Sequence, residues 1–245
     1  QKTAYEIGVR LVGSEMCIRD RLHRVFLEEE MKKLTHLAAS LVLALSGLIA
    51  TSASAEVSYN IGWASEYYYR GIFQNDSSGS AGIDWSEGGF YAGSWAADVG
   101  DGTEVDGYFG YNFEFDSGFT AGVGFTGYYY TGEFDDTYEE VNFNLGYGPL
   151  SLGYSVGEWE GFGAAQDYDF LELTFTAENG IYGTYGTFGD EFDGDYIQIG
   201  WGTTISEIDI SIAGIFSSDE LSDQLNSAGQ ATESEAIVFT IGKSF

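Results

Sequence analysis

The sequence has 245 residues, and 39 Asp and Glu residues against nine Lys and Arg residues give it a formal net charge of −30. This balance excludes nucleic-acid binding and attachment to anionic membrane surfaces through basic patches, because both need clustered Lys and Arg side chains. Aromatic residues make up 17% of the chain, which excludes a disordered acidic protein, since such proteins are poor in aromatic residues.

The first 55 residues are expected to contribute nothing to the fold. Met31 begins an export signal, in which two lysines and an apolar run at 37–50 precede a small-x-small cleavage pattern at 53–55. The run is too short for a membrane-spanning helix, which needs about twenty residues. Residues 1–30 precede this complete signal peptide (31–55) and carry five of the nine basic residues. We interpret them as an artefactual extension, and a genuine extension is the alternative.

The remaining residues, 56–245, contain 33 acidic residues and only two basic residues, Arg70 and Lys243. They contain no Cys, His or Met, which excludes disulfide bonds, zinc sites with Cys or His ligands, and catalysis by Ser-His or Cys-His pairs. We therefore expect no enzyme, no cofactor and no metal site. An acid–base enzyme that uses paired carboxylates remains an alternative, although no distinctive motif indicates one.

Twelve β-strands are expected in this part of the chain, separated by turns rich in Gly, Asp, Asn and Ser. Apolar residues alternate with small or polar residues, so each strand has one apolar face and one face of Gly, Thr, Asn and acids. In a soluble sandwich the polar face would carry Lys and Arg; their scarcity indicates a hydrated, crowded interior. The expected strands cover residues 57–68, 80–86, 90–99, 104–115, 119–131, 137–147, 150–158, 166–177, 181–189, 195–203, 207–217 and 235–245.

The connections between these strands alternate between short turns and longer or more acidic loops. With both ends of the chain on the periplasmic side, twelve strands need five short turns and six outer loops, and an even strand number closes the sheet without an edge. The sequence therefore predicts an all-β, transmembrane, antiparallel up-and-down β-barrel. The short turns are 87–89, 116–118, 148–149, 178–180 and 204–206; the outer loops are 69–79, 100–103, 132–136, 159–165, 190–194 and 218–234.

Aromatic residues concentrate near the ends of the expected strands, as in the interfacial girdles of membrane barrels. For the run 67–69 we favour anchoring at the membrane interface, and stacking against a ring-bearing solute is the alternative. The girdle residues expected in this way are Tyr67, Tyr68, Tyr69, Trp95, Tyr128, Tyr129, Tyr130 and Trp201.

The last ten residues form an alternating strand that ends on an aromatic residue. Ile237 and three further apolar residues share one face, and Val238 begins a face of mostly small or polar residues. The segment resembles the closing strand of bacterial outer-membrane barrels. This resemblance implies that Phe239, Ile241 and Phe245 form the signal that the barrel assembly machinery reads.

Three segments resemble the TorF-type porin family of proteobacterial outer membranes. They read S-E-Y-Y-Y-R-G-I-F-Q at 65–74, G-F-Y-A-G-S-W-A at 89–96 and L-G-Y-G-P-L-S-L-G-Y-S at 145–155. The resemblance implies a barrel in the outer membrane of a Gram-negative bacterium, in contact with lipid and lipopolysaccharide, with a channel role. It implies no particular solute, and the oligomeric state is not indicated.

Acidic residues recur on the predicted inner face. Carboxylates in a narrow lumen concentrate cations and repel anions, so we predict a passive, cation-preferring channel for small hydrophilic solutes. Adaptation to saline surroundings is an alternative explanation of the acidity, and a non-conducting structural or adhesive barrel is the alternative function. The predicted pore-lining acids are Glu66, Asp84, Asp106, Glu114, Glu140, Glu172 and Asp209.

Strand parity places Arg70 on the same inner face. It could pair with Glu66 or another inward acid and shape a constriction. We favour a structural ion pair that fixes the first loop, because a buried Arg needs partners whatever the function. Asp190, Asp193 and Asp195 could bind Ca²⁺ through oxygen ligands, but a solvated acidic loop is the favoured interpretation.

Overall fold

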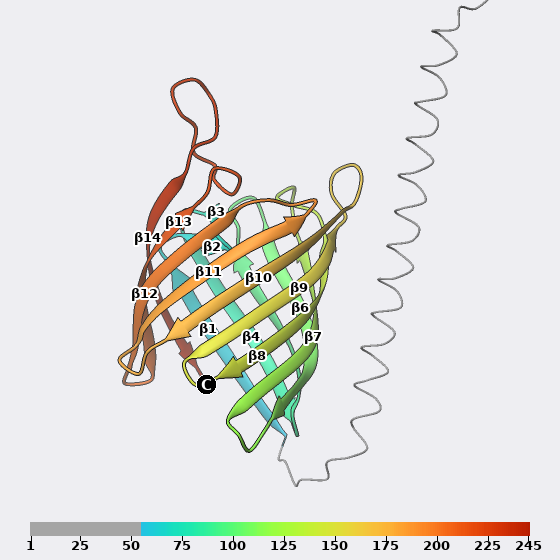
Figure 1. Ribbon diagram of the computed structural model, residues 1–245, viewed down its shortest axis with the longest axis vertical. Coiled ribbons are helices and arrows are strands. Elements are labelled where there is room, and N and C mark those ends of the chain that lie inside the picture. Colours follow the sequence, from blue (N-terminus) through green and yellow to red (C-terminus); the bar gives the residue numbers. More distant parts are fainter. Residues whose placement is uncertain (1–54) are drawn as a thin grey trace, which may run out of the picture. The chain divides into compact units, whose positions relative to one another are not determined.

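The computed structural model describes residues 55–245, so the extension predicted at 1–30 and nearly all of the signal predicted at 31–55 lie outside the described residues. Twelve strands form a closed antiparallel barrel, and consecutive barrel strands are neighbours (Figure 1). The predicted fold class is confirmed. The barrel strands are β1 (Glu56–Ala64), β4 (Ser78–Glu87), β5 (Phe90–Asp98), β6 (Thr103–Glu114), β7 (Phe119–Tyr130), β8 (Tyr138–Tyr147), β9 (Leu150–Trp159), β10 (Gln166–Thr176), β11 (Ile181–Asp190), β12 (Asp195–Ile205), β13 (Ile208–Ser217) and β14 (Ser234–Ser244).

Pairing between the first and last strands closes the barrel. Trp63 of β1 lies opposite Ile241 of β14, and the backbone groups of Tyr59 and Phe245 exchange two hydrogen bonds. In Figure 1 the carboxy terminus lies at the lower end with the short turns, and the longer loops lie at the upper end. We call these the turn end and the loop end.

The outer surface of the barrel is apolar because alternate residues of every strand point outward. Ile61 is 55% exposed, and outward-facing apolar residues of other strands, including Phe109, Ile199 and Ile212, are exposed to a similar extent. A soluble protein rarely exposes so continuous an apolar surface. The alternation that predicted the strands thus produces a lipid-type exterior and a polar interior.

The first predicted strand, 57–68, is too long, because β1 ends at Ala64 and the chain leaves the barrel wall. Two short strands, β2 (Tyr67–Tyr69) and β3 (Ile72–Asn75), then form a separate antiparallel hairpin before β4 begins. Arg70 and Gly71 join them with φ values of 49° and 81°. Two consecutive positive φ values are those of a type I′ turn, the tight connection that suits β-hairpins. We call residues 67–75 the lumen hairpin.

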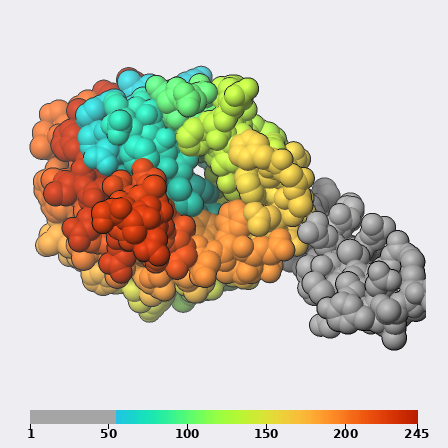
Figure 2. Space-filling model, turned by 90° about the horizontal axis from the view of Figure 1, so that it is seen from above, coloured from blue at the N-terminus to red at the C-terminus, as the bar shows by residue number. Residues whose placement is uncertain are grey.

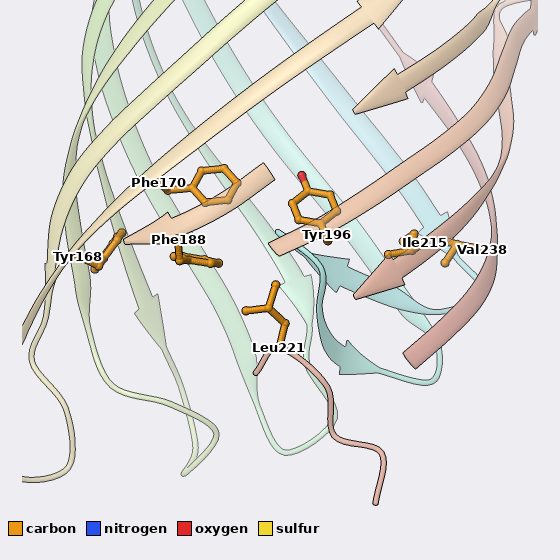
Figure 3. Close-up of a cluster of buried hydrophobic side chains, with 7 residues drawn as sticks. All are labelled: Tyr168, Phe170, Phe188, Tyr196, Ile215, Leu221 and Val238. Carbon is orange, nitrogen blue, oxygen red and sulfur yellow. The ribbon is translucent and has the colours of Figure 1, made fainter. Parts of the chain in front are cut away.

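Apolar side chains fill part of the barrel interior near the loop end. The hairpin contributes Tyr68 and Ile72 to this packing, and Leu221 enters it from the loop between β13 and β14 (Figure 3). The prediction of an outer loop at 69–79 therefore missed a segment that folds back into the barrel. The buried members of the cluster are Tyr168, Phe170, Phe188, Tyr196, Ile215, Leu221 and Val238.

A matched pair of substitutions on β12 tests the assignment of the two faces. Ile199→Arg places a charge on the outward face and should lower the free energy of unfolding in lipid by about 2–4 kcal/mol, as charges at the bilayer midplane do. Gln198→Arg, one residue earlier on the inward face, should cost much less. Urea unfolding in liposomes measures both changes, and equal costs would show that the outward face does not contact lipid.

Candidate functional site

The tip of the lumen hairpin is bound to the barrel wall by a buried ion pair. The Arg70 guanidinium donates from both terminal nitrogens to Glu140 of β8, with N–O distances of 2.8 Å each, and Nη2 also donates to Ser155 Oγ of β9 at 3.2 Å. The side chain of Glu140 is 0% exposed and that of Arg70 is 12% exposed. Two parallel charge-assisted bonds fix both the distance and the orientation of the pair.

The wall itself supplies further donors to the Glu140 carboxylate. Tyr128 and Asn142 donate to Oε1, each at 2.7 Å, and Tyr168 donates to Oε2 at 2.9 Å. Asn142 also donates to Ser155 at 3.1 Å and accepts a bond from Thr126 at 2.8 Å. A buried ion pair is tolerated only when hydrogen bonds satisfy its remaining lone pairs, and these neighbours meet that condition.

Two aromatic rings lie close to the guanidinium. The Arg70 Cζ atom lies 4.2 Å from the ring centroid of Phe170 and 4.9 Å from that of Tyr69. Both distances are within the range of a cation–π attraction, which strengthens when the cation is desolvated. The Tyr69 hydroxyl donates to the hydroxyl of Tyr128 at 2.7 Å, so the hairpin and the wall also share this hydrogen bond.

The opposite side of the hairpin tip contacts the other side of the barrel. Ser217 of β13 donates to the Gly71 carbonyl oxygen at 2.6 Å. A Cβ atom at Gly71 would lie 2.6 Å from Cβ of Tyr196, so only glycine fits here. In the ring of twelve strands β8 and β13 are five positions apart, which is nearly opposite. The lumen hairpin therefore crosses the barrel interior.

The base of the hairpin contacts a second, acidic part of the wall. The Tyr67 hydroxyl donates to Glu104 at 3.0 Å, and its ring lies edge-on to Trp95 at 5.9 Å. Burial of this phenol, and then the negative charge of Glu104, raise the pKa of Tyr67 well above its usual value. The phenol therefore stays protonated and can donate. In the part of the chain that the structure describes, Glu104 Oε2 and Asp106 Oδ1 are buried without a hydrogen-bond partner.

These contacts correct the prediction that Tyr67–Tyr69 and Trp95 lie in an interfacial girdle. Tyr67 and Tyr69 bind acidic and phenolic groups of the interior, and Trp95 faces the hairpin. Tyr128 also points inward, to Glu140, whereas Tyr129 on the other face is 45% exposed. The aromatic run therefore belongs to the interior, because its chain segment is a hairpin rather than a continuation of β1.

Two cavities lie inside the barrel beside the hairpin. The smaller, of about 290 Å³, is lined by Arg70, Glu140 and Glu172, together with Tyr91 and Asn144. The larger, of about 560 Å³, is lined by residues of β1, β4 and β12–β14, among them Asp209, and by Tyr67 and Trp95. Viewed from the loop end, the molecule is hollowed near its centre, and the dark orange loop between β13 and β14 covers part of the opening (Figure 2).

The predicted inward acids occupy different surroundings. Glu172 accepts a bond from Tyr196 at 2.7 Å, Asp84 accepts one from Tyr108 at 2.5 Å, and Asp209 accepts one from Thr204 at 2.6 Å. Asp106 is buried, at 8% exposed. Glu114 is exposed near the turn end of β6, and Glu66 lies between β1 and β2 without an ion pair to Arg70.

Sequence reasoning missed several residues that build this site: Glu104, Tyr128, Ser155, Tyr168 and Phe170. All but Ser155 lie on strands where residues of the same parity could be assigned to the inner face, so parity could have placed them inward. Their roles depend on the hairpin, which the pattern did not reveal. Phe239, Ile241 and Phe245 lie on the outward face of the closing strand, at 40%, 40% and 64% exposed.

Within residues 55–245, no helix is long and apolar enough to cross a membrane. The same residues contain no group of three or more His, Cys, Asp or Glu side chains placed to hold a metal ion.

Residues 49–245 match the model of a family described as "Bacterial protein of unknown function (Gcw_chp)", and the chain belongs to this family. No protein of curated function matches it. Among solved structures, a protein from a study of the in-meso crystallization of membrane proteins is similar in fold, with a TM-score of 0.52 and 6% identity over 77% of this chain and 83% of that one.

Two other similar structures are of longer chains. OccD1 (OprD) has a TM-score of 0.42 and 10% identity over 77% of this chain and 65% of its own. OccK2 (OpdF) of Pseudomonas aeruginosa, solved in complex with glucuronate, has a TM-score of 0.40 and 12% identity over 81% of this chain and 68% of its own. The chain thus spans slightly less than two thirds of the length of OccD1.

A glycine pair tests the docking of the hairpin tip. Gly71→Ala introduces a Cβ at a positive φ and against Tyr196, so the tip should withdraw from β12 and backbone amides 67–75 should exchange faster with deuterium. Gly79→Ala is the control, because nothing lies within 4 Å of its added Cβ. Unchanged exchange in Gly71→Ala would contradict the tight docking of the tip.

Proposed function

We propose that this member of the Gcw_chp family is an outer-membrane channel of the TorF-type porin kind, which passes small hydrophilic solutes by diffusion and prefers cations. The observation that carries the proposal is the combination of an apolar exterior with a closed barrel whose interior holds cavities and inward carboxylates. Such an interior is not needed for a structural barrel, whose lumen side chains can fill the space completely.

The charges of the interior support cation preference. Arg70 is neutralised by Glu140, and Lys243 on the outward face pairs with Glu207 at 2.9 Å. Uncompensated carboxylates therefore dominate the lumen, among them Asp84 and Asp209. In a narrow, low-dielectric passage these groups attract cations and repel anions. Passage of this kind involves no bond-making, so no catalytic residue is proposed.

The lumen hairpin would set the width of the passage. It crosses the barrel between β8 and β13, and solutes can pass only beside it or after it moves. A barrel of this strand number is already intermediate between filled and wide-pore barrels. We therefore propose a low-conductance pore whose narrowest part lies at the level of Arg70.

A second candidate function is a non-conducting barrel whose outer loops contact partners. The apolar cluster near the loop end, which includes Leu221 from the longest loop, favours it. Planar-bilayer recordings separate the two functions, because a filled scaffold carries no ionic current while a narrow pore gives small discrete steps.

The outer membrane of a Gram-negative bacterium is the proposed location, reached through the predicted signal peptide and the barrel assembly machinery. The exposed closing residues Phe239, Ile241 and Phe245 would be read during assembly. Outer-membrane lipid and lipopolysaccharide would then contact the apolar surface. These contacts require a barrel in the membrane, so this part of the proposal depends on the proposed location.

Ion selectivity tests the role of the lumen charges. Under a KCl gradient the reversal potential should have the sign of cation preference, and Asp84→Asn combined with Asp209→Asn should move it toward zero because two lumen charges are lost. Glu235→Gln removes one charge from the outward face of β14 and should leave the potential unchanged. A wild-type potential with the sign of anion preference would refute the selectivity.

Single-channel conductance tests the role of the hairpin. Glu140→Gln leaves the Arg70 charge buried without its partner, and breaking a buried pair in this way costs about 3–5 kcal/mol. The hairpin should leave its position, and the conductance should rise at least about twofold as the constriction widens. Glu139→Gln, on the outward face of the same strand, is the control. A conductance equal to that of the wild type would place the constriction elsewhere.

A further inference from the structure

Most of the groups that contact the Arg70 guanidinium belong to the barrel wall. Glu140 of β8 provides the planar carboxylate, Ser155 of β9 a hydroxyl acceptor, and Phe170 of β10 an aromatic face. We call these three residues the wall pocket. The lumen hairpin contributes the cation itself and the ring of Tyr69. The wall therefore presents a nearly complete set of contacts for a guanidinium.

The wall pocket is also held in place without help from the hairpin. Tyr128, Tyr168 and Asn142 orient the Glu140 carboxylate, and Asn142 additionally binds Ser155. All of these donors lie on barrel strands. A binding site whose groups are positioned by surrounding hydrogen bonds loses little entropy when its ligand arrives. If Arg70 left, the carboxylate would still face the vacated space in the same orientation.

A cavity inside the barrel adjoins this pocket. The cavity of about 290 Å³ is lined by Arg70 as well as by all three wall-pocket residues. Its other walls carry the Tyr91 hydroxyl and the Asn144 amide, which make no hydrogen bond to another side chain within residues 55–245. A small organic cation could rest in the cavity directly beside the Arg70–Glu140 pair.

We propose that the wall pocket is a binding site for guanidinium groups, that Arg70 is its built-in occupant, and that a small solute bearing a guanidinium group can take the place of Arg70. Displacement would free the lumen hairpin, and this step rests on the channel function proposed above. The bidentate bonds and the stacked ring select a planar guanidinium over a compact ammonium, which cannot make both contacts at once.

In the wild type, an added solute must compete for the wall pocket with Arg70, which the lumen hairpin tethers beside it. A group held on a short linker acts at an effective concentration on the order of millimolar or more, so the wild-type pocket responds only to concentrated solute. The test therefore begins with a variant whose pocket is vacant. Arg70→Asn removes the guanidinium and creates an Asn-Gly pair, the preferred sequence of a type I′ turn, so the turn itself is retained.

The experiment follows thermal unfolding of the purified Arg70→Asn barrel in detergent, titrated with low-millimolar methylguanidinium. Binding should raise the melting temperature by about 2–4 °C, because a ligand that binds only the folded state stabilises it. Methylammonium at the same concentration should raise it much less. Equal shifts with the two cations would overturn the proposal.

The double variant Arg70→Asn with Glu140→Gln is the matched control, because it lacks the carboxylate but keeps the vacant space. It should show no difference between the two cations, and a persistent guanidinium-specific shift would place the site elsewhere and overturn the proposal. If Arg70→Asn assembles only when methylguanidinium is present, the proposal is supported. If it fails to assemble under all conditions, the wild-type barrel is used.

In the wild type, excess methylguanidinium should accelerate deuterium exchange of amides 67–75, and methylammonium should not. Equal exchange under the two cations would overturn the proposal.

Bilayer recordings distinguish a failure of the binding site from a failure of the channel function. Methylguanidinium should reduce the current of Arg70→Asn at least about twofold by refilling the pocket. A specific thermal shift with no current in any variant supports the site and contradicts only the channel function.

Discussion

The buried ion pair between Arg70 and Glu140 is the interaction on which the interior of this barrel depends. Glu140 is fully buried and Arg70 nearly so, and separating them would leave a charge without a counter-ion in a poorly solvated space. The hairpin that carries Arg70 is therefore bound far more firmly than its few backbone hydrogen bonds alone would allow. Because the pair lies nearly opposite the contact between Ser217 and Gly71, the hairpin spans the lumen rather than lining it.

The Arg70–Glu140 pair affects the charge of the lumen because basic residues are scarce. Residues 56–245 contain only Arg70 and Lys243 as cations, against 33 acidic residues. With Lys243 paired on the outward face, Arg70 is the one positive charge that the described interior contains. Its position fixes where the lumen is neutral, and the remaining carboxylates make the rest of the lumen acidic. The placement of the hairpin across the lumen and the local charge balance thus depend on the same side chain.

The fold could be predicted from the sequence because a two-residue period is a local signal. Strands such as β7, in which Ala121 and Val123 alternate with Gly122 and Gly124, show both faces directly, and the predicted bounds agree closely with the structure. Closure followed from the even strand number and from the alternation of short turns with longer loops. The inward placement of Glu140 and Glu172 followed from parity alone.

The hairpin could not be predicted in the same way. The segment from Tyr67 to Tyr69 has the aromatic composition of a strand end in a membrane barrel, and nothing local distinguishes a strand in the wall from one inside it. The positive φ of Arg70 and Gly71 is a property of the folded turn. The choice of Glu140 as partner depends on register across several strands, which local alternation does not encode. Parity placed Arg70 inward, although the strand from which it was extended ends at Ala64.

The most direct test of the central claim is a double-mutant cycle on the ion pair, with the free energy of unfolding measured in lipid for the wild type, Arg70→Asn, Glu140→Gln and the double variant. If the pair holds the hairpin in place, the two substitutions are strongly non-additive, with a coupling energy of about 1.5–3 kcal/mol. Costs that add within about 0.5 kcal/mol would show that the two charges do not interact in the folded barrel, and the account of a hairpin bound across the lumen would be contradicted.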